Sequence, residues 1–92
     1  MGYSIQAKTA TGEEIDYFHY PNKDIDRPLH RVLGVGYIKD QTKIVKQYSL
    51  GSLLEAKSKL MDITGTLGEQ DFLDRGIAET KESRKPITIT FN

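Results

Sequence analysis

The sequence predicts a small α+β domain: an antiparallel sheet, made of an N-terminal hairpin, a second hairpin and a C-terminal strand, with two main helices packed on one face. Apolar and polar residues alternate over residues 2–8 and again near the C-terminus, which is the period of a half-buried strand. Between these ends, leucines recur at helical spacing in residues 49–64. A chain of 92 residues has room for one core, so we expect one domain over 1–92.

The first predicted hairpin joins residues 2–8 to residues 14–20. Tyr3, Ile5 and Ala7 alternate with polar residues in the first segment, and the second segment, EIDYFHY, is rich in residues that favour strands. Gly12 lies in the intervening turn, where a residue able to take positive φ is needed. These two strands should pair with each other.

Residues 26–33 have an ambiguous pattern that is compatible with a short helix, with Asp26 or Arg27 near its cap. Pro28 would lie in its first turn, where a missing N–H costs little, and Gly34 would end it. With two turns at most, this helix depends on tertiary packing of its leucines and valine.

Residues 35–49 are compatible with two structures. Two clusters of β-branched and aromatic residues flank a polar centre at 39–42, which favours a second hairpin. The alternative is a helix that begins near Asp40 or Thr42 and continues into the central helix. That helix would contain Gly51, at a cost of about 1 kcal/mol relative to alanine.

The central helix, over about 50–64, has the strongest pattern in the chain. Ser49 suits its N-cap, a capping box between Ser52 and Glu55 is the alternative, and Gly65 suits its C-terminal end. Its predicted inner stripe consists of Leu50, Leu53, Leu54, Leu60 and Met61.

A second main helix is expected over about 67–83. Thr66 and Glu69 have the spacing of a capping box, and Pro86 prevents the helix from continuing. Its basic C-terminal residues Lys81, Arg84 and Lys85 suit the negative end of the helix dipole. The candidate inward residues are Leu67, Phe72, Leu73, Ile77 and Ala78.

The C-terminal segment ITITF predicts a strand with Ile87, Ile89 and Phe91 facing inward. Such a strand must join a sheet, so we expect it to pair with a strand from the N-terminal half of the chain.

Composition narrows the possible functions. Thirteen basic and thirteen acidic residues are interspersed, which does not favour nucleic acid as a partner. No apolar run is long enough to span a bilayer, so no membrane partner is expected. Because cysteine is absent and the N-terminus lacks the pattern of a signal peptide, we expect a cytoplasmic protein.

No motif predicts catalysis, a cofactor or a metal. Gly34 and Gly36 lack the third glycine of a dinucleotide fingerprint, because position 39 is lysine. His19 and His30 flank two aspartates, Asp24 and Asp26, but without a metal-ligand spacing. The glycines at 65 and 68 could offer N–H groups to an anion, although such a segment more often only connects two helices. The carboxylate pairs 13–14 and 71–74 lie beside a turn and on a solvated helix face.

The most suggestive feature is a group of aromatic residues. The candidate partner-binding residues are Tyr3, Tyr17, Phe18, Tyr20 and Tyr37. Because side chains alternate along a strand, Tyr17 and His19 must face opposite to Phe18 and Tyr20, so one set is core and the other is surface. Tyrosine suits contact surfaces, since it buries a large area and keeps a hydroxyl for hydrogen bonding.

These features predict a small non-enzymatic protein-binding module, an accessory or inhibitory protein, with self-association as one form of the interaction. The alternative is a single-stranded nucleic-acid-binding protein that stacks bases on the same aromatic face. Its phosphate contacts would come from Lys8, Lys39, Lys43 and Lys46. A metal-dependent or acid–base enzyme is the least favoured of the three.

Overall fold

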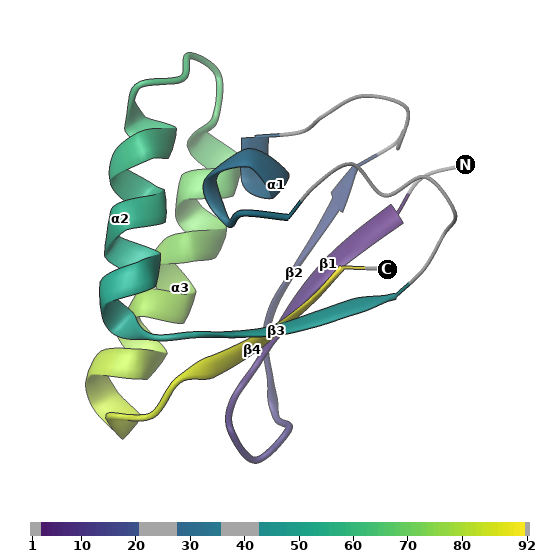
Figure 1. The fold of residues 1–92 in the computed structure, drawn as a ribbon, viewed down its shortest axis with the longest axis vertical. Helices are drawn as coiled ribbons and strands as arrows, with labels where there is room; N and C mark the ends of the chain where they lie inside the picture. The colour runs from purple at the N-terminus through teal and green to yellow at the C-terminus, as the bar shows by residue number, and fades with distance from the viewer. Residues whose placement is uncertain (1–2, 21–27, 36–42, 92) are drawn as a thin grey trace.

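The computed structural model describes residues 3–20, 28–35 and 43–91, and it confirms the α+β class. Figure 1 shows α2 and α3 side by side in a layer next to the sheet. The elements in chain order are β1 (Tyr3–Lys8), β2 (Glu14–Tyr20), α1 (Pro28–Val32), β3 (Ile44–Tyr48), α2 (Leu50–Met61), α3 (Leu67–Ser83) and β4 (Ile87–Phe91). Within the described ranges, no helix is long and apolar enough to cross a membrane.

The four described strands form one antiparallel sheet in the order β2-β1-β4-β3. The predicted N-terminal hairpin is confirmed, with Ile5 of β1 opposite Phe18 of β2. The C-terminal strand pairs with β1, as expected, through Ile5 opposite Phe91, and it also pairs with β3. The predicted inward residues Ile87, Ile89 and Phe91 are all buried.

Residues 44–48 form a strand, so the helical alternative for this region is wrong. β3 finds its backbone partners in β4, with Tyr48 opposite Ile87, and α2 begins only at Leu50. In this pairing Tyr48 lies beside Ile87, and both side chains are buried. Residues 36–42, which hold the turn of the expected second hairpin and all of its first arm except Val35, lie outside the described residues.

The short helix α1 is confirmed, with Pro28 as its first residue and Gly34 just beyond it at φ 74°. Its buried residues include Leu29, and the helix packs against α2. The Tyr48 hydroxyl donates a hydrogen bond of 2.8 Å to the carbonyl oxygen of Leu33, the residue that follows α1. This bond ties the end of α1 to β3.

Helix α2 begins at the expected cap, because the Ser49 hydroxyl accepts a hydrogen bond from the backbone N–H of Ser52. The expected inner stripe is correct only in part. The buried residues are Leu53, Ala56 and Leu60, whereas Leu54 is 45% exposed and Met61 is also exposed. Each residue turns the helix by about 100°, so Leu54 and Met61 fall beside the face that packs on α1 and α3.

Helix α3 spans the expected residues, but two of its expected inward residues are wrong. Leu67 is 79% exposed and Ala78 is also exposed, while Gly76 and Thr80 are buried. At Gly76 an added Cβ would lie 2.8 Å from Cδ1 of Ile87, so the glycine lets α3 approach β4 closely. Phe72, Leu73 and Ile77 are buried as expected, so apolar size identified the inner face of this helix only in part.

The capping box predicted at the start of α3 does not form. The Thr66 side chain makes no cap hydrogen bond, and its hydroxyl instead donates to the carbonyl oxygens of Leu60 and Ile63. Glu69 is also used elsewhere, since a carboxylate oxygen accepts a hydrogen bond from the Tyr20 hydroxyl. Both side chains hold neighbouring elements together rather than satisfying the first turn of α3.

Candidate functional site

The two faces of the sheet differ in what covers them. The face toward the helices carries the buried residues Ile5, Ala7, Ile87, Ile89 and Phe91. We call the opposite side the open face; by strand alternation and register it carries Ser4, Gln6, Lys8, Glu14, Tyr17, His19, Val45, Gln47, Thr88 and Thr90. None of these ten residues is buried: five are exposed and five are half-buried. The open face therefore carries accessible side chains from all four described strands.

A row of four side chains crosses the centre of the open face. Register places Tyr17 of β2 opposite Gln6 of β1, Gln6 opposite Thr90 of β4, and Thr90 opposite Val45 of β3. The two ends of the row are the most accessible, with Tyr17 49% exposed and Val45 54% exposed. Side chains in such a row lie within contact distance of each other, so the row forms a continuous surface.

The ring of Tyr17 stacks on the ring of His19, with centroids 6.5 Å apart and planes 13° from parallel. Both side chains are exposed and come from β2, which is at one edge of the four-stranded sheet. The two rings therefore form one exposed aromatic patch near this edge of the sheet.

The open face carries little net charge. Lys8 lies directly opposite Glu14 in the β1–β2 ladder, so these two charges offset each other. Three other lysines were candidates for phosphate contacts. By strand alternation Lys46 is on the face opposite to the open face, and its Nζ donates a hydrogen bond of 3.4 Å to the Gly34 carbonyl oxygen. Lys43 is exposed just before β3, and Lys39 lies outside the described residues. The three described lysines of this set are therefore not gathered beside Tyr17.

The structure separates the predicted aromatic group. Tyr17 is on the open face, whereas Tyr20 is buried and Phe18 is half-buried against the core, 6.3 Å from the ring of Phe72. Tyr3 begins β1 opposite Tyr20, and Tyr37 lies outside the described residues. Of Tyr17, Phe18 and Tyr20, whose burial is described, Tyr17 is the exposed one.

Sequence reasoning missed the partners of Tyr17 in the central row. Gln6, Thr90 and Val45 come from strands that are distant along the chain, and only the strand order brings them together. The alternation of threonine and isoleucine in β4 signals that Thr88 and Thr90 share a face. It does not indicate which strands flank them.

The described residues considered for catalysis or metal binding are dispersed, and Asp24 and Asp26 lie outside the described residues. His19 is on the open face, while His30 is buried on the other side of the sheet with its ring edge-on to Phe91. The carboxylates at 71 and 74 make surface ion pairs, Asp71 with Arg75 and Asp74 with Lys57. In the part of the chain that the structure describes, no group of three histidines or acidic residues could hold a metal ion.

Comparison of the chain with known protein families, with curated proteins and with solved structures finds no match in any of the three.

Proposed function

We propose that this protein is a non-enzymatic protein-binding module whose contact surface is the open face, centred on Tyr17. The observation that supports the proposal most strongly is an aromatic residue, half-exposed and stacked on His19, on a sheet face that lies outside the core. Tyrosine is enriched at protein interfaces because its ring buries much area and its hydroxyl can find a partner. We also propose that the protein is cytoplasmic.

The charge on the open face favours a protein over a single-stranded nucleic acid. Proteins that bind single strands combine stacking side chains with a cationic groove that follows the phosphates. On the open face the charge of Lys8 is offset by Glu14 on the neighbouring strand. Lys46 of β3 is on the opposite face of the sheet. A neutral surface with amide, hydroxyl and aromatic groups suits a polar protein surface better.

The size of the open face predicts a weak or transient complex. Four strands about 4.8 Å apart, with five to seven residues each at about 3.3 Å, span roughly 20 by 20 Å. That area of roughly 400 Å² is about half of what each partner contributes to a standard stable interface. A tighter complex would need contacts beyond this face, for example at the β2 edge.

Substitutions on the two sides of the molecule test the proposal. Tagged wild-type protein and the variants Tyr17→Ala and Val45→Ala are purified from cells of the source organism under mild conditions, and co-purifying proteins are quantified. Leu54→Ala is the matched control, because Leu54 is 45% exposed but lies on α2. All three variants should remain folded, since each removes an exposed side chain.

A protein that is recovered with wild type and Leu54→Ala, and depleted with both open-face variants, would support the proposal. Equal recovery with Tyr17→Ala, Val45→Ala and wild type would contradict it. Sedimentation of the purified protein over a range of concentrations distinguishes self-association from another partner. If the partner is a second copy, the wild-type dimer should be lost in Tyr17→Ala and kept in Leu54→Ala.

A further inference from the structure

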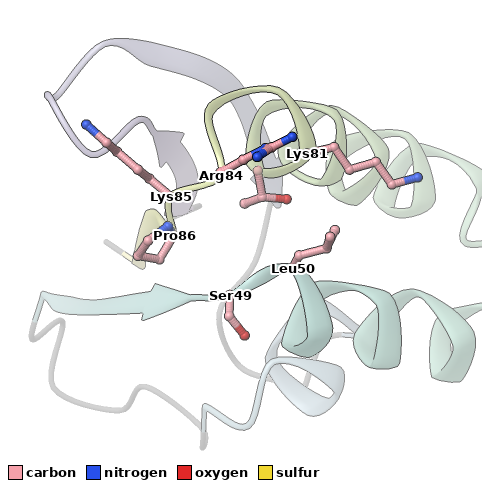
Figure 2. Close-up of a pocket in the computed structure, with 7 residues that line it drawn as sticks. Ser49, Leu50, Lys81, Arg84, Lys85 and Pro86 are labelled. Carbon is pink, nitrogen blue, oxygen red and sulfur yellow. The ribbon is translucent and has the colours of Figure 1, made fainter.

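A pocket of about 450 Å³ lies where the C-terminal end of α3 meets the N-terminal end of α2, away from the open face (Figure 2). This volume is in the range of small-molecule sites. Figure 2 shows Arg84 on one side of the pocket and Leu50 on the other. The lining residues are Ser49, Leu50, Thr80, Lys81, Arg84, Lys85 and Pro86.

The lining of this pocket is positively charged and has no acidic residue. Three of its seven residues are cations, Lys81, Arg84 and Lys85, and none of them makes an ion pair with another described residue. The lysine side chains extend to either side of the pocket in Figure 2. Because both are exposed, their ammonium groups can reorient within nanoseconds.

Helix dipoles do not offset this charge. The negative end of α3 favours nearby cations, but the positive end of α2 lines the same pocket through Leu50. Each helix end is equivalent to about half a charge, of opposite sign, so the two roughly cancel. The positive charge of the three side chains is therefore left for an anion.

Arg84 occupies its position at a conformational cost. It is the left-handed C-cap of α3, with φ 59° and ψ 28°. Among the described residues, the other positive-φ positions are all glycines: Gly12, Gly34 and Gly65. Glycine takes this conformation without strain, and an L-residue with a side chain does not. Arg84 thus lines the pocket from a backbone conformation that costs some stability.

We propose that this pocket binds a small organic anion, an oxyanion group attached to an apolar body. The guanidinium of Arg84 matches the planar geometry of a carboxylate or phosphate, and the two lysines add charge. The apolar body packs between Leu50 and Pro86, which supply the apolar part of the lining. This site is independent of the proposed protein-binding face.

Benzoate and benzamide are suitable probes because they have nearly the same shape and differ in charge. Each is titrated into ¹⁵N-labelled protein while amide chemical shifts are recorded. Benzoate should give saturable shifts at Leu50, Thr80 and Arg84, and benzamide should give none. In Arg84→Gly the benzoate affinity should fall about tenfold or more, as expected for loss of one charge-assisted contact.

Arg84→Gly also separates binding from folding. Because it relieves the left-handed conformation, its urea midpoint should be higher than that of wild type, so lost binding cannot be a consequence of unfolding. Lys59→Gln, an exposed lysine of α2 outside the pocket, should bind benzoate as wild type does. Inorganic phosphate should bind more weakly than benzoate, because it has no apolar body.

Several outcomes would overturn the proposal. Benzamide binding as well as benzoate would show that charge has no role, and unchanged benzoate affinity in Arg84→Gly would exclude the guanidinium. Phosphate that matches benzoate in affinity would remove the role of Leu50 and Pro86. Absence of any saturable shift with benzoate would exclude the site itself.

Discussion

The hydroxyl of Tyr20 donates a hydrogen bond of 3.0 Å to a carboxylate oxygen of Glu69, and both residues are buried. The same hydroxyl oxygen accepts a hydrogen bond of 3.4 Å from the backbone N–H of Leu29. One side chain of β2 thereby connects α3 and α1. Hydrogen bonds to ionisable groups are stronger than neutral ones, and the loss of one partner leaves the other buried without it.

Tyr20→Phe should therefore lower the free energy of unfolding by about 2 kcal/mol. Urea denaturation of wild type and variant at pH 7 measures this difference. The matched control is Glu69→Gln, which keeps an acceptor oxygen for the tyrosine and should cost less than Tyr20→Phe. If Tyr20→Phe is as stable as wild type, the buried bond to Glu69 has no energetic role.

A second buried tyrosine predicts a pH effect. Burial raises the pKa of Tyr48 from 10.0 to about 12, because the charged phenolate would lose its hydration. The folded state thus holds this proton more tightly than the unfolded state does. Its contribution to stability is complete below pH 10 and is lost as the pH rises through about 12, by about 3 kcal/mol in total.

Comparison of wild type with Tyr48→Phe isolates that contribution, because other groups titrate equally in both proteins. At pH 8 the variant should be less stable by about 1 kcal/mol, since the Leu33 carbonyl oxygen loses its donor. Above pH 11 this deficit should shrink or reverse. A stability difference that stays constant from pH 8 to pH 11.5 would contradict the raised pKa.

The same substitution at two helical glycines should have opposite consequences. Gly76→Val should destabilise the protein by about 1–3 kcal/mol, because Cβ already meets the side chain of Ile87. Gly51→Val should be neutral or slightly stabilising, since nothing lies within 4 Å of its added Cβ. Thermal denaturation of both variants checks this. Equal losses at the two positions would show that α3 does not approach β4 as closely as described.

Local patterns predicted which elements form. The alternation of β1, β2 and β4 is a property of adjacent residues, and so is the N-cap at Ser49, and all of these are present. Glycines at positive φ, such as Gly34 and Gly65, lie where the predicted helices end. These features depend on a few neighbouring residues, which is why the sequence alone reveals them.

Which side of a helix is buried depends on distant residues, and here prediction from sequence was less successful. Leu67 is apolar but exposed, while Thr80 is polar but buried with its hydroxyl donating to the Ile77 carbonyl oxygen. Glu69 does not form the predicted capping box, because its carboxylate accepts a hydrogen bond from Tyr20, a buried donor 49 residues away in the chain. Such competition between local and distant partners cannot be read from spacing.

The candidate site shows the same division. Alternation in β2 predicted that Tyr17 and Tyr20 face opposite ways, but only burial in the fold decides which one is accessible. The row that joins Tyr17 to Val45 depends on the strand order β2-β1-β4-β3. That strand order requires β1 to pair with β4, and these two strands lie at opposite ends of the sequence.

Site-specific photo-crosslinking tests the role of the open face most directly. A photoreactive phenylalanine analogue replaces Tyr17 in one variant and Leu54 in a second, and both are irradiated in extracts of the source cells and as purified protein. We predict a discrete covalent adduct with a protein from position 17, and none from position 54. An adduct from position 54 alone, or from neither position, would contradict the assignment of the open face as the protein-binding surface.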